Sequence, residues 1–144
     1  MSGLKTLFRL ESSERRLVLQ TLLLVATIRI ALSILSVQRV QRLTSSWQRF
    51  LIVDKDMPVS RLVWAVRAAS RRIPAASCLT QSLALHCLLT RAGRASQLQI
   101  GVAKDPTSKF QAHAWVECEG EPLLSGPAAV VGYVHMLAME DKPA

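Results

Sequence analysis

The stretch from Pro74 to Gly126 decides the fold of this chain. It begins PAASCLTQSLAL at residues 74–85 and includes FQAHAWVE at residues 110–117. Cys78 stands at the mouth of an apolar helix, and His113, 35 residues later, stands on a predicted strand. A catalytic Cys and His must be close in the fold, not in the sequence. The stretch therefore predicts a thiol nucleophile with an imidazole base, although a structural cysteine and a hydrogen-bonded strand histidine would show the same spacing.

The predicted helix begins at Ser77 and runs to about Arg91, and Gly93 provides its stop. Its start places unsatisfied backbone N–H groups and the positive end of the helix dipole beside Cys78. Both favour the thiolate, which is the reactive form of cysteine. Cys87 lies nine residues further on among leucines, where a thiol is usually an inert small apolar group. The pattern therefore predicts one reactive and one structural cysteine on the same helix.

After this helix the pattern changes to strands. They are expected at residues 95–102, 110–117 and 121–124, followed by an apolar segment at 128–139 that fits either a strand or a closing helix. A three-residue hairpin loop at 118–120 would pair Glu117 with Glu121. This register sets His113 opposite Ser125, with Cβ atoms about 4.5–5.5 Å apart. Ser125 is therefore the predicted third position, the residue that orients the imidazole.

Length and composition bound the class of protein. The 144 residues suit one domain, or one domain with a helical prefix, and 50% apolar with 19% charged residues exclude a disordered chain. The net charge of +8 is concentrated in residues 1–72, which carry +9, whereas residues 73–144 carry −1. Three cysteines without a disulfide framework fit a reducing cytosol. No metal-ligand spacing is present, so the sequence predicts neither a metal nor an organic cofactor.

The apolar run from Leu17 to Val37 has three interpretations. Its 21 residues are enough to span a bilayer, but Arg29 near the centre costs about 2.5–3.5 kcal/mol on insertion. Arg15-Arg16 ahead of the run resembles an export signal, but no small-residue cleavage site follows. We favour a buried or surface-lying helix whose arginines extend to water. Such a helix would dock on the catalytic half, on a partner or on a membrane surface.

Further helices are expected over residues 43–52 and 59–71.

Taken in order, the motifs resemble those of a known family. They read CLxxSLAL at 78–85, LLxRxG at 88–93, LxIGV at 98–102 and AHAWVE at 112–117. This set is similar to the transglutaminase-like cysteine-peptidase domain of lasso-peptide B proteins, the microcin-processing leader-peptidase family, over about residues 58–126. The resemblance implies an α+β, papain/transglutaminase-like fold. In that fold N-terminal helices precede a core helix that bears the Cys and packs on a small antiparallel sheet that bears the His.

The resemblance also implies a domain division and a set of partners. A basic, apolar helical prefix would occupy residues 1–56, and the peptidase domain would occupy residues 57–144. Members of the family are cytoplasmic bacterial hydrolases that cut a ribosomally made precursor peptide between leader and core. A separate ATP-dependent macrolactam cyclase then joins the freed core amine to a side-chain carboxylate. Because the chain is too short to hold a leader-recognition domain as well, it resembles the stand-alone peptidase, and a separate leader-recognition protein is expected.

The site roles follow from the same resemblance. Cys78 would be the nucleophile, His113 the general base and acid, and Ser125 the third position, where some relatives carry Asp. Serine accepts a hydrogen bond but cannot neutralise an imidazolium charge, so Ser125 departs from part of the family.

Two other classes of function stay open from the sequence. Ser125 suggests a non-catalytic partner subunit of a peptide-maturation complex. The basic first half suggests a membrane- or nucleic-acid-associated binding protein. Aromatic stacking groups and glycine-rich flexibility are lacking, so no nucleic acid is expected as a partner. Membrane contact through residues 17–37 is retained, and the predicted localisation is cytoplasmic or membrane-peripheral.

Overall fold

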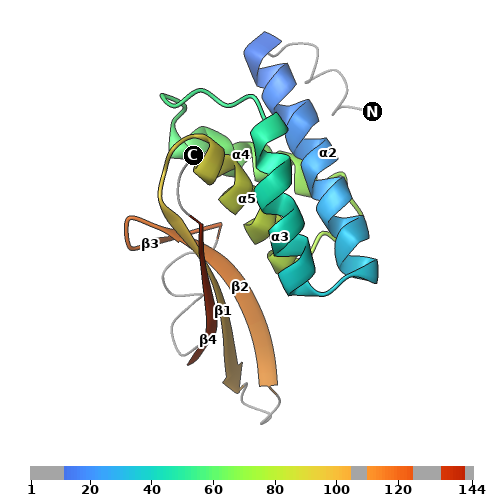
Figure 1. Ribbon diagram of the computed structural model, residues 1–144, viewed down its shortest axis with the longest axis vertical. Helices are drawn as coiled ribbons and strands as arrows, with labels where there is room; N and C mark the ends of the chain where they lie inside the picture. The colour runs from blue at the N-terminus through green and yellow to red at the C-terminus, as the bar shows by residue number, and fades with distance from the viewer. Residues whose placement is uncertain (1–11, 105–109, 125–133, 142–144) are drawn as a thin grey trace.

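The computed structural model describes residues 12–104, 110–124 and 134–141. Its helical elements are α2 (Ser12–Ile34), α3 (Val37–Trp47), the 3-10 helix η1 (Gln48–Phe50), α4 (Val59–Ser70) and α5 (Cys78–Arg91). Its strands are β1 (Ser96–Lys104), β2 (Phe110–Cys118), β3 (Glu121–Leu123) and β4 (Val134–Asp141). The strands form one antiparallel sheet in the order β3-β2-β1-β4, with the helices gathered on one side of it (Figure 1). The expected α+β fold is confirmed.

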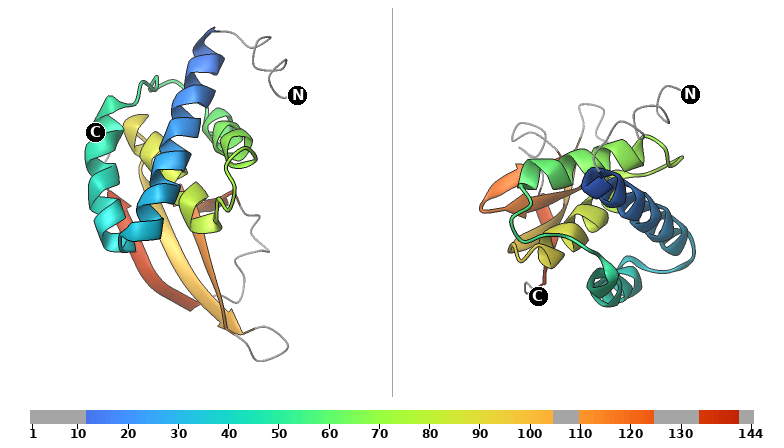
Figure 2. Two further views of the ribbon diagram at one scale, coloured as in Figure 1. Left: turned by 90° about the vertical axis from the view of Figure 1, so that its right-hand side faces the viewer. Right: turned by 90° about the horizontal axis from the view of Figure 1, so that it is seen from above.

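Helix α5 lies at the centre of the molecule. It contacts α2 and α4 on one side and β1 and β2 on the other, as the three views of the ribbon show (Figures 1 and 2). Its side chains are buried on almost every face, as the leucine-rich sequence predicts for a core helix. The helix that begins with Cys78 is therefore the element on which the other layers pack.

The ends of α5 are fixed by local chemistry. Ser77 is the N-cap, and its Oγ accepts a hydrogen bond from the N–H of Thr80 at 3.2 Å. At the other end Gly93 has φ +79°, a left-handed conformation that glycine adopts without strain. The N–H of Gly93 binds the carbonyl of Thr90, and the N–H of Arg94 binds the carbonyl of Leu89. Both predicted ends of the helix are confirmed.

One hydrophobic cluster joins the helices to the sheet. Its fully buried members include Val25 and Ile28 of α2, Leu62 of α4, Leu88 of α5 and Leu98 of β1. Burying each such side chain stabilises the fold by about 1.5–3 kcal/mol. Helix α2 of the basic prefix thus shares its core with the segments that follow residue 56. The domain boundary expected between residues 56 and 57 stays a prediction.

Helix α2 is long and apolar enough to cross a membrane, the one such helix among the described residues. Its most apolar 18-residue window has a mean hydropathy of 2.1, and 39% of that window is buried inside the protein. The inner side of α2 packs on α4 and α5, in agreement with the favoured interpretation of a helix docked on the half of the chain that bears Cys78 and His113.

The hairpin between β2 and β3 differs from the expected one. Cys118 pairs with Glu121, and Glu117 pairs with Pro122, so the loop contains only Glu119 and Gly120. These two residues have φ +55° and φ +81°, the positive pair that suits a tight hairpin between twisted strands. The expected three-residue loop and the pairing of Glu117 with Glu121 are therefore wrong by one residue. Of the apolar segment at 128–139, the part from Val134 on belongs to a strand, β4, and not to a helix.

Candidate active site

Cys78 occupies the first turn of α5 and is exposed to solvent. The first four N–H groups of a helix have no acceptor within it, so the thiol sits where an anion is favoured. The other two cysteines, Cys87 and Cys118, are buried. Burial raises the pKa of the Cys118 thiol, the charge of Glu119 raises it further, and Arg94 opposes both effects. Cys78 is therefore the exposed thiol of the three, at the place that the sequence predicts.

His113 lies in β2 opposite Gly101 of β1 and is half-buried. Its ring stacks on that of Trp115, with centroids 5.9 Å apart and planes inclined by 20°. Trp115 is fully buried, and its Nε1 donates a hydrogen bond to Glu117 Oε1 at 3.0 Å. Because residue 101 is glycine, β1 places no side chain directly opposite the imidazole. The strand thus holds His113 against a rigid aromatic neighbour.

The two faces of the sheet carry different chemistry. Side chains alternate along a strand, and Leu98, Val116 and Cys118 point into the hydrophobic cluster that contains α5. His113 and Trp115 occupy the alternate positions and therefore lie on the opposite face. The face toward the helices is apolar, and the face with His113 is polar and aromatic.

Cys78 and His113 lie on elements that contact each other. Helix α5 packs on β2, and in Figures 1 and 2 the start of α5 lies beside that strand. Strand β3 pairs only with residues 116–118, so among the described residues β2 forms the edge of the sheet at His113. No hydrogen bond joins Cys78 to His113 within the described part of the chain. The structure therefore places the two residues on contacting elements but does not bring their side chains together, because His113 lies on the face of the sheet away from α5.

Ser125, the predicted third residue, lies outside the described residues. Its assignment opposite His113 depended on pairing Glu117 with Glu121, and the observed register differs by one residue. The geometric argument for Ser125 therefore fails, and its assignment rests on the resemblance alone.

The structure points to Gln99 as a group that sequence reasoning missed. Gln99 lies opposite Trp115 on the face of His113 and is only 4% exposed. Its Nε2 donates to Gln97 Oε1 at 3.1 Å, whereas its buried Oε1 has no hydrogen-bond partner among the described residues. A buried acceptor without a donor is costly and rare. The only sequence signal was a polar residue between Leu98 and Ile100 on a predicted strand.

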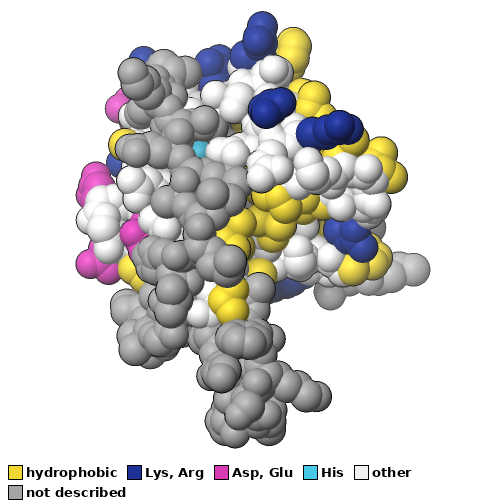
Figure 3. All heavy atoms as spheres, turned by 60° about the horizontal axis from the view of Figure 1, so that its bottom comes forward, with side chains coloured by type: hydrophobic (Ala, Val, Ile, Leu, Met, Phe, Trp, Pro, Cys, Tyr) yellow, Lys and Arg dark blue, Asp and Glu magenta, His cyan; other side chains and the backbone are white. Residues whose placement is uncertain are grey.

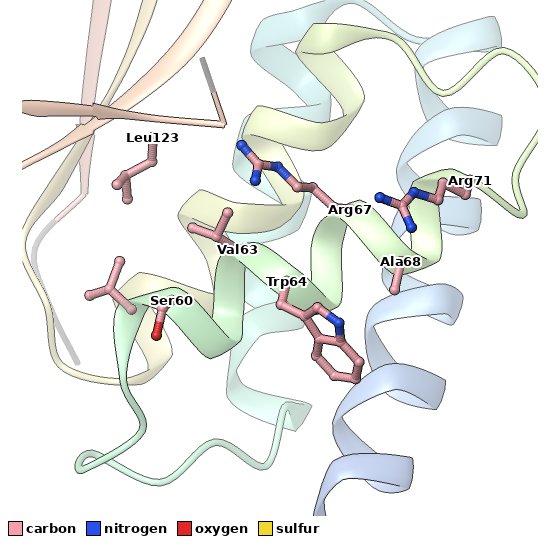
Figure 4. A pocket seen from close by; sticks show the side chains of 8 residues that line it. Ser60, Val63, Trp64, Arg67, Ala68, Arg71 and Leu123 are labelled. Carbon is pink, nitrogen blue, oxygen red and sulfur yellow. The ribbon is translucent and has the colours of Figure 1, made fainter. Parts of the chain in front are cut away.

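A groove beside the sheet was also not foreseen. It measures about 450 Å³ and is lined by Val59, Ser60, Val63, Trp64, Arg67, Ala68, Arg71 and Leu123. Figure 4 shows Val63 and Arg67 on the side of α4 that faces Leu123. Arg67 Nη2 donates to the carbonyl of Leu124 at 3.3 Å and so ties α4 to the end of β3. The groove combines two guanidinium groups with apolar walls, and residues 71–77 connect the end of α4 to Cys78.

The remaining polar groups do not form a second centre. His86 is buried in α5, and its Nδ1 lies 2.7 Å from Ser96 Oγ, a contact that joins the helix to β1. Over the described residues no group of three His, Cys, Asp or Glu side chains is placed to hold a metal ion. The chemistry available to the described site is that of a thiol, an imidazole and amide groups.

Comparison with known proteins agrees with this geometry. The family model described as Transglutaminase-like superfamily matches residues 21–138. No curated protein and no solved structure matches the chain. The matched superfamily includes cysteine peptidases and transferases, and its model spans both Cys78 and His113. The chain belongs to the transglutaminase-like superfamily.

Proposed function

We propose that the protein is a cysteine endopeptidase that removes the leader from a ribosomally made lasso-peptide precursor. One observation carries the proposal: the exposed thiol of Cys78 opens the core helix that packs on the strand of His113, inside a transglutaminase-like domain. The specific substrate is supported by the ordered motifs around both residues, which resemble those of lasso-peptide B proteins.

The proposed reaction proceeds through a thioester. His113 takes the proton of Cys78, and the sulfur attacks the carbonyl carbon of the bond between leader and core. The backbone N–H of Cys78, at the start of α5, donates to the oxyanion. His113 then gives its proton to the nitrogen of the core as the C–N bond breaks. Water, deprotonated by His113, hydrolyses the thioester, which releases the leader carboxylate and restores the thiol.

In a Cys–His site the base is in turn oriented by a third group. Glu117 already accepts the Trp115 N–H, so its carboxylate is engaged. Gln99 Oε1 is buried, unpartnered among the described residues and diagonal to His113 across the β1–β2 pair. Diagonal neighbours are within reach of long side chains. We assign the orienting role to Gln99. The resemblance favours a different residue, Ser125, for the same role.

The groove along α4 provides a place for the substrate. Apolar walls from Val63 and Leu123 would hold an extended peptide, and Arg67 and Arg71 would favour a segment that carries carboxylates. A separate leader-recognition protein would deliver the precursor, and an ATP-dependent cyclase would take the released core. This activity belongs in the cytoplasm, where the free thiols stay reduced.

The test uses the purified protein, its precursor peptide and the leader-recognition partner, with products identified by mass spectrometry. Cys78→Ala is compared with the wild type and with Cys87→Ala, a matched change of a buried thiol on the same helix. We expect cleavage by the wild type and by Cys87→Ala, and a loss of at least about 10³-fold for Cys78→Ala. Equal cleavage by Cys78→Ala would overturn the proposal.

A second candidate is a non-catalytic partner subunit. It is favoured by the position of His113 on the face of the sheet away from α5, the helix that bears Cys78. The same experiment separates the two functions, because a partner subunit would support normal maturation of the precursor when Cys78 is replaced by Ala.

A further inference from the structure

Helix α2 carries an apolar stripe that nothing in the described structure covers. Leu19, Leu23, Ile30 and Ile34 are 51%, 70%, 66% and 76% exposed. Their spacing of four, seven and four residues puts them within an arc of about 60° on one side of the helix. Large exposed apolar patches on soluble domains mark interaction sites. The stripe is therefore a candidate interaction surface.

A neighbouring segment extends this stripe. Phe50 and Ile52, which follow α3, are 77% and 57% exposed. The side chain of Gln20 fixes the segment to α2: its Nε2 donates to the carbonyl of Ile52 at 2.7 Å, and its Oε1 accepts the Ile52 N–H at 3.1 Å. Between them lies an apolar pocket of about 330 Å³ lined by Gln20, Leu23, Leu24, Thr27, Trp47, Phe50 and Leu51. We call this whole surface, with the stripe on α2, the α2 face.

The charge around the α2 face has one sign. Residues 12–50 contain six arginines and a single acid, Glu14, which forms an ion pair with Arg61. Arg16, Arg42 and Arg49 are exposed, and Arg16 lies in line with the stripe at the start of α2. Figure 3 shows arginine or lysine side chains next to hydrophobic ones on the helical side of the molecule. The apolar stripe with arginines beside it complements a bilayer, which has an apolar interior and negatively charged headgroups at its surface.

The side of α2 opposite the stripe is buried in the domain, and this determines how α2 can lie relative to a membrane. Leu17, Val25 and Ile28 on that side are 0–3% exposed and pack in the core of the domain. If α2 crossed a bilayer, these side chains would leave the core and the domain would lose one of its layers. A helix with one side in the protein and the other side apolar and flanked by cations lies flat at a membrane interface.

We propose that the α2 face docks the domain on an anionic phospholipid bilayer, with α2 parallel to the membrane plane. Leu23, Ile30 and Phe50 enter the acyl boundary, and the arginines contact lipid phosphates. This proposal is independent of the peptidase activity, since no residue of the α2 face belongs to the candidate active site.

The experiment is sedimentation of the full chain with vesicles of phosphatidylcholine alone or with 30% phosphatidylglycerol. We expect binding to the anionic vesicles, at least tenfold weaker binding to the neutral ones, and release in 0.5 M NaCl. The double variant Leu23→Gln/Ile30→Gln removes apolar surface that is already exposed, so its circular dichroism and thermal midpoint should match the wild type. Its binding to anionic vesicles should fall at least tenfold.

Charge variants provide the matched control. Arg16→Gln should weaken binding several-fold, whereas Arg72→Gln, the same change at an exposed position two residues beyond α4, should not. Equal binding to both vesicle types, or unchanged binding of the double variant, would overturn the proposal. Light scattering that shows a dimer of the wild type, broken by the double variant and with no vesicle binding, would assign the face to a second copy of the chain and would also overturn it.

Discussion

The first turn of α5 and the interior of the same helix contain similar residue types in opposite surroundings. Cys78 in the first turn is exposed, whereas Cys87, nine residues later, is 2% exposed among leucines. The first turn presents free backbone N–H groups and leads into the loop from α4, while the interior contacts α2, α4 and the sheet. The comparison shows that position on the helix, not residue type, separates the exposed thiol from the buried one.

The largest change in the free energy of unfolding should come from a substitution in the interior of α5. Leu88→Ala deletes a fully buried side chain and leaves a cavity, so it should lower the free energy of unfolding by about 2–5 kcal/mol. Cys78→Ala, at an exposed position, should change it by less than about 0.5 kcal/mol. Urea unfolding measures both. Similar losses of unfolding free energy for the two variants would contradict this difference between the first turn and the interior of α5.

Gln99 is buried but polar, and its side-chain oxygen has no hydrogen-bond partner among the described residues. Gln99→Leu removes an unpartnered acceptor, so the fold should be as stable as the wild type or more stable. If Gln99 orients His113, the same change should lower kcat for precursor cleavage about tenfold, change its pH profile and leave KM unchanged. Steady-state cleavage across pH separates these effects. A stable variant with wild-type kcat and pH profile would remove Gln99 from the site.

The N-cap connects the first turn to the rest of the helix. Ser77→Ala loses the hydrogen bond from the Thr80 N–H and should lower the free energy of unfolding by about 1 kcal/mol. Ser46→Ala, at an exposed position in α3, is the matched control and should change it by less than about 0.5 kcal/mol. Thermal unfolding of both variants checks the difference, and no loss for Ser77→Ala would contradict the assigned cap.

The smallest effect concerns the buried thiol of the sheet. Burial raises the pKa of Cys118 above that of an unfolded cysteine, which is about 8.5. The fold therefore keeps its full stability below about pH 8.5 and loses part of it as the pH rises through the raised folded-state pKa. Cys118→Ala should flatten the decline in unfolding free energy above that pH. An unchanged slope would mean that this thiol does not contribute to it.

The local features of this chain could be predicted from its sequence because local chemistry determines them. Ser77 and Gly93 define the ends of α5, and the 2-residue alternation after Gly93 predicts β1 and β2. The hairpin register could not be obtained in this way, since Glu119 adopts a positive φ without being glycine, asparagine or aspartate. A one-residue difference there was enough to undo the geometric case for Ser125.

The candidate site was predicted only in part. The period of two shows that His113 shares a face with Trp115, but not which face packs on α5. The partnerless oxygen of Gln99 and the groove beside Leu123 arise from contacts between segments far apart in the sequence. Such groups become visible only when strands and helices are placed together.

The most direct test of the account asks whether Cys78 and His113 act as a pair. The measurement is the rate of iodoacetamide alkylation of each cysteine at pH 7, followed by peptide mass mapping in the wild type and in His113→Ala. We predict that Cys78 reacts first of the three thiols in the wild type and that His113→Ala slows its alkylation at least about tenfold. Equal rates for Cys78 in the two proteins, both of them folded, would contradict the central claim.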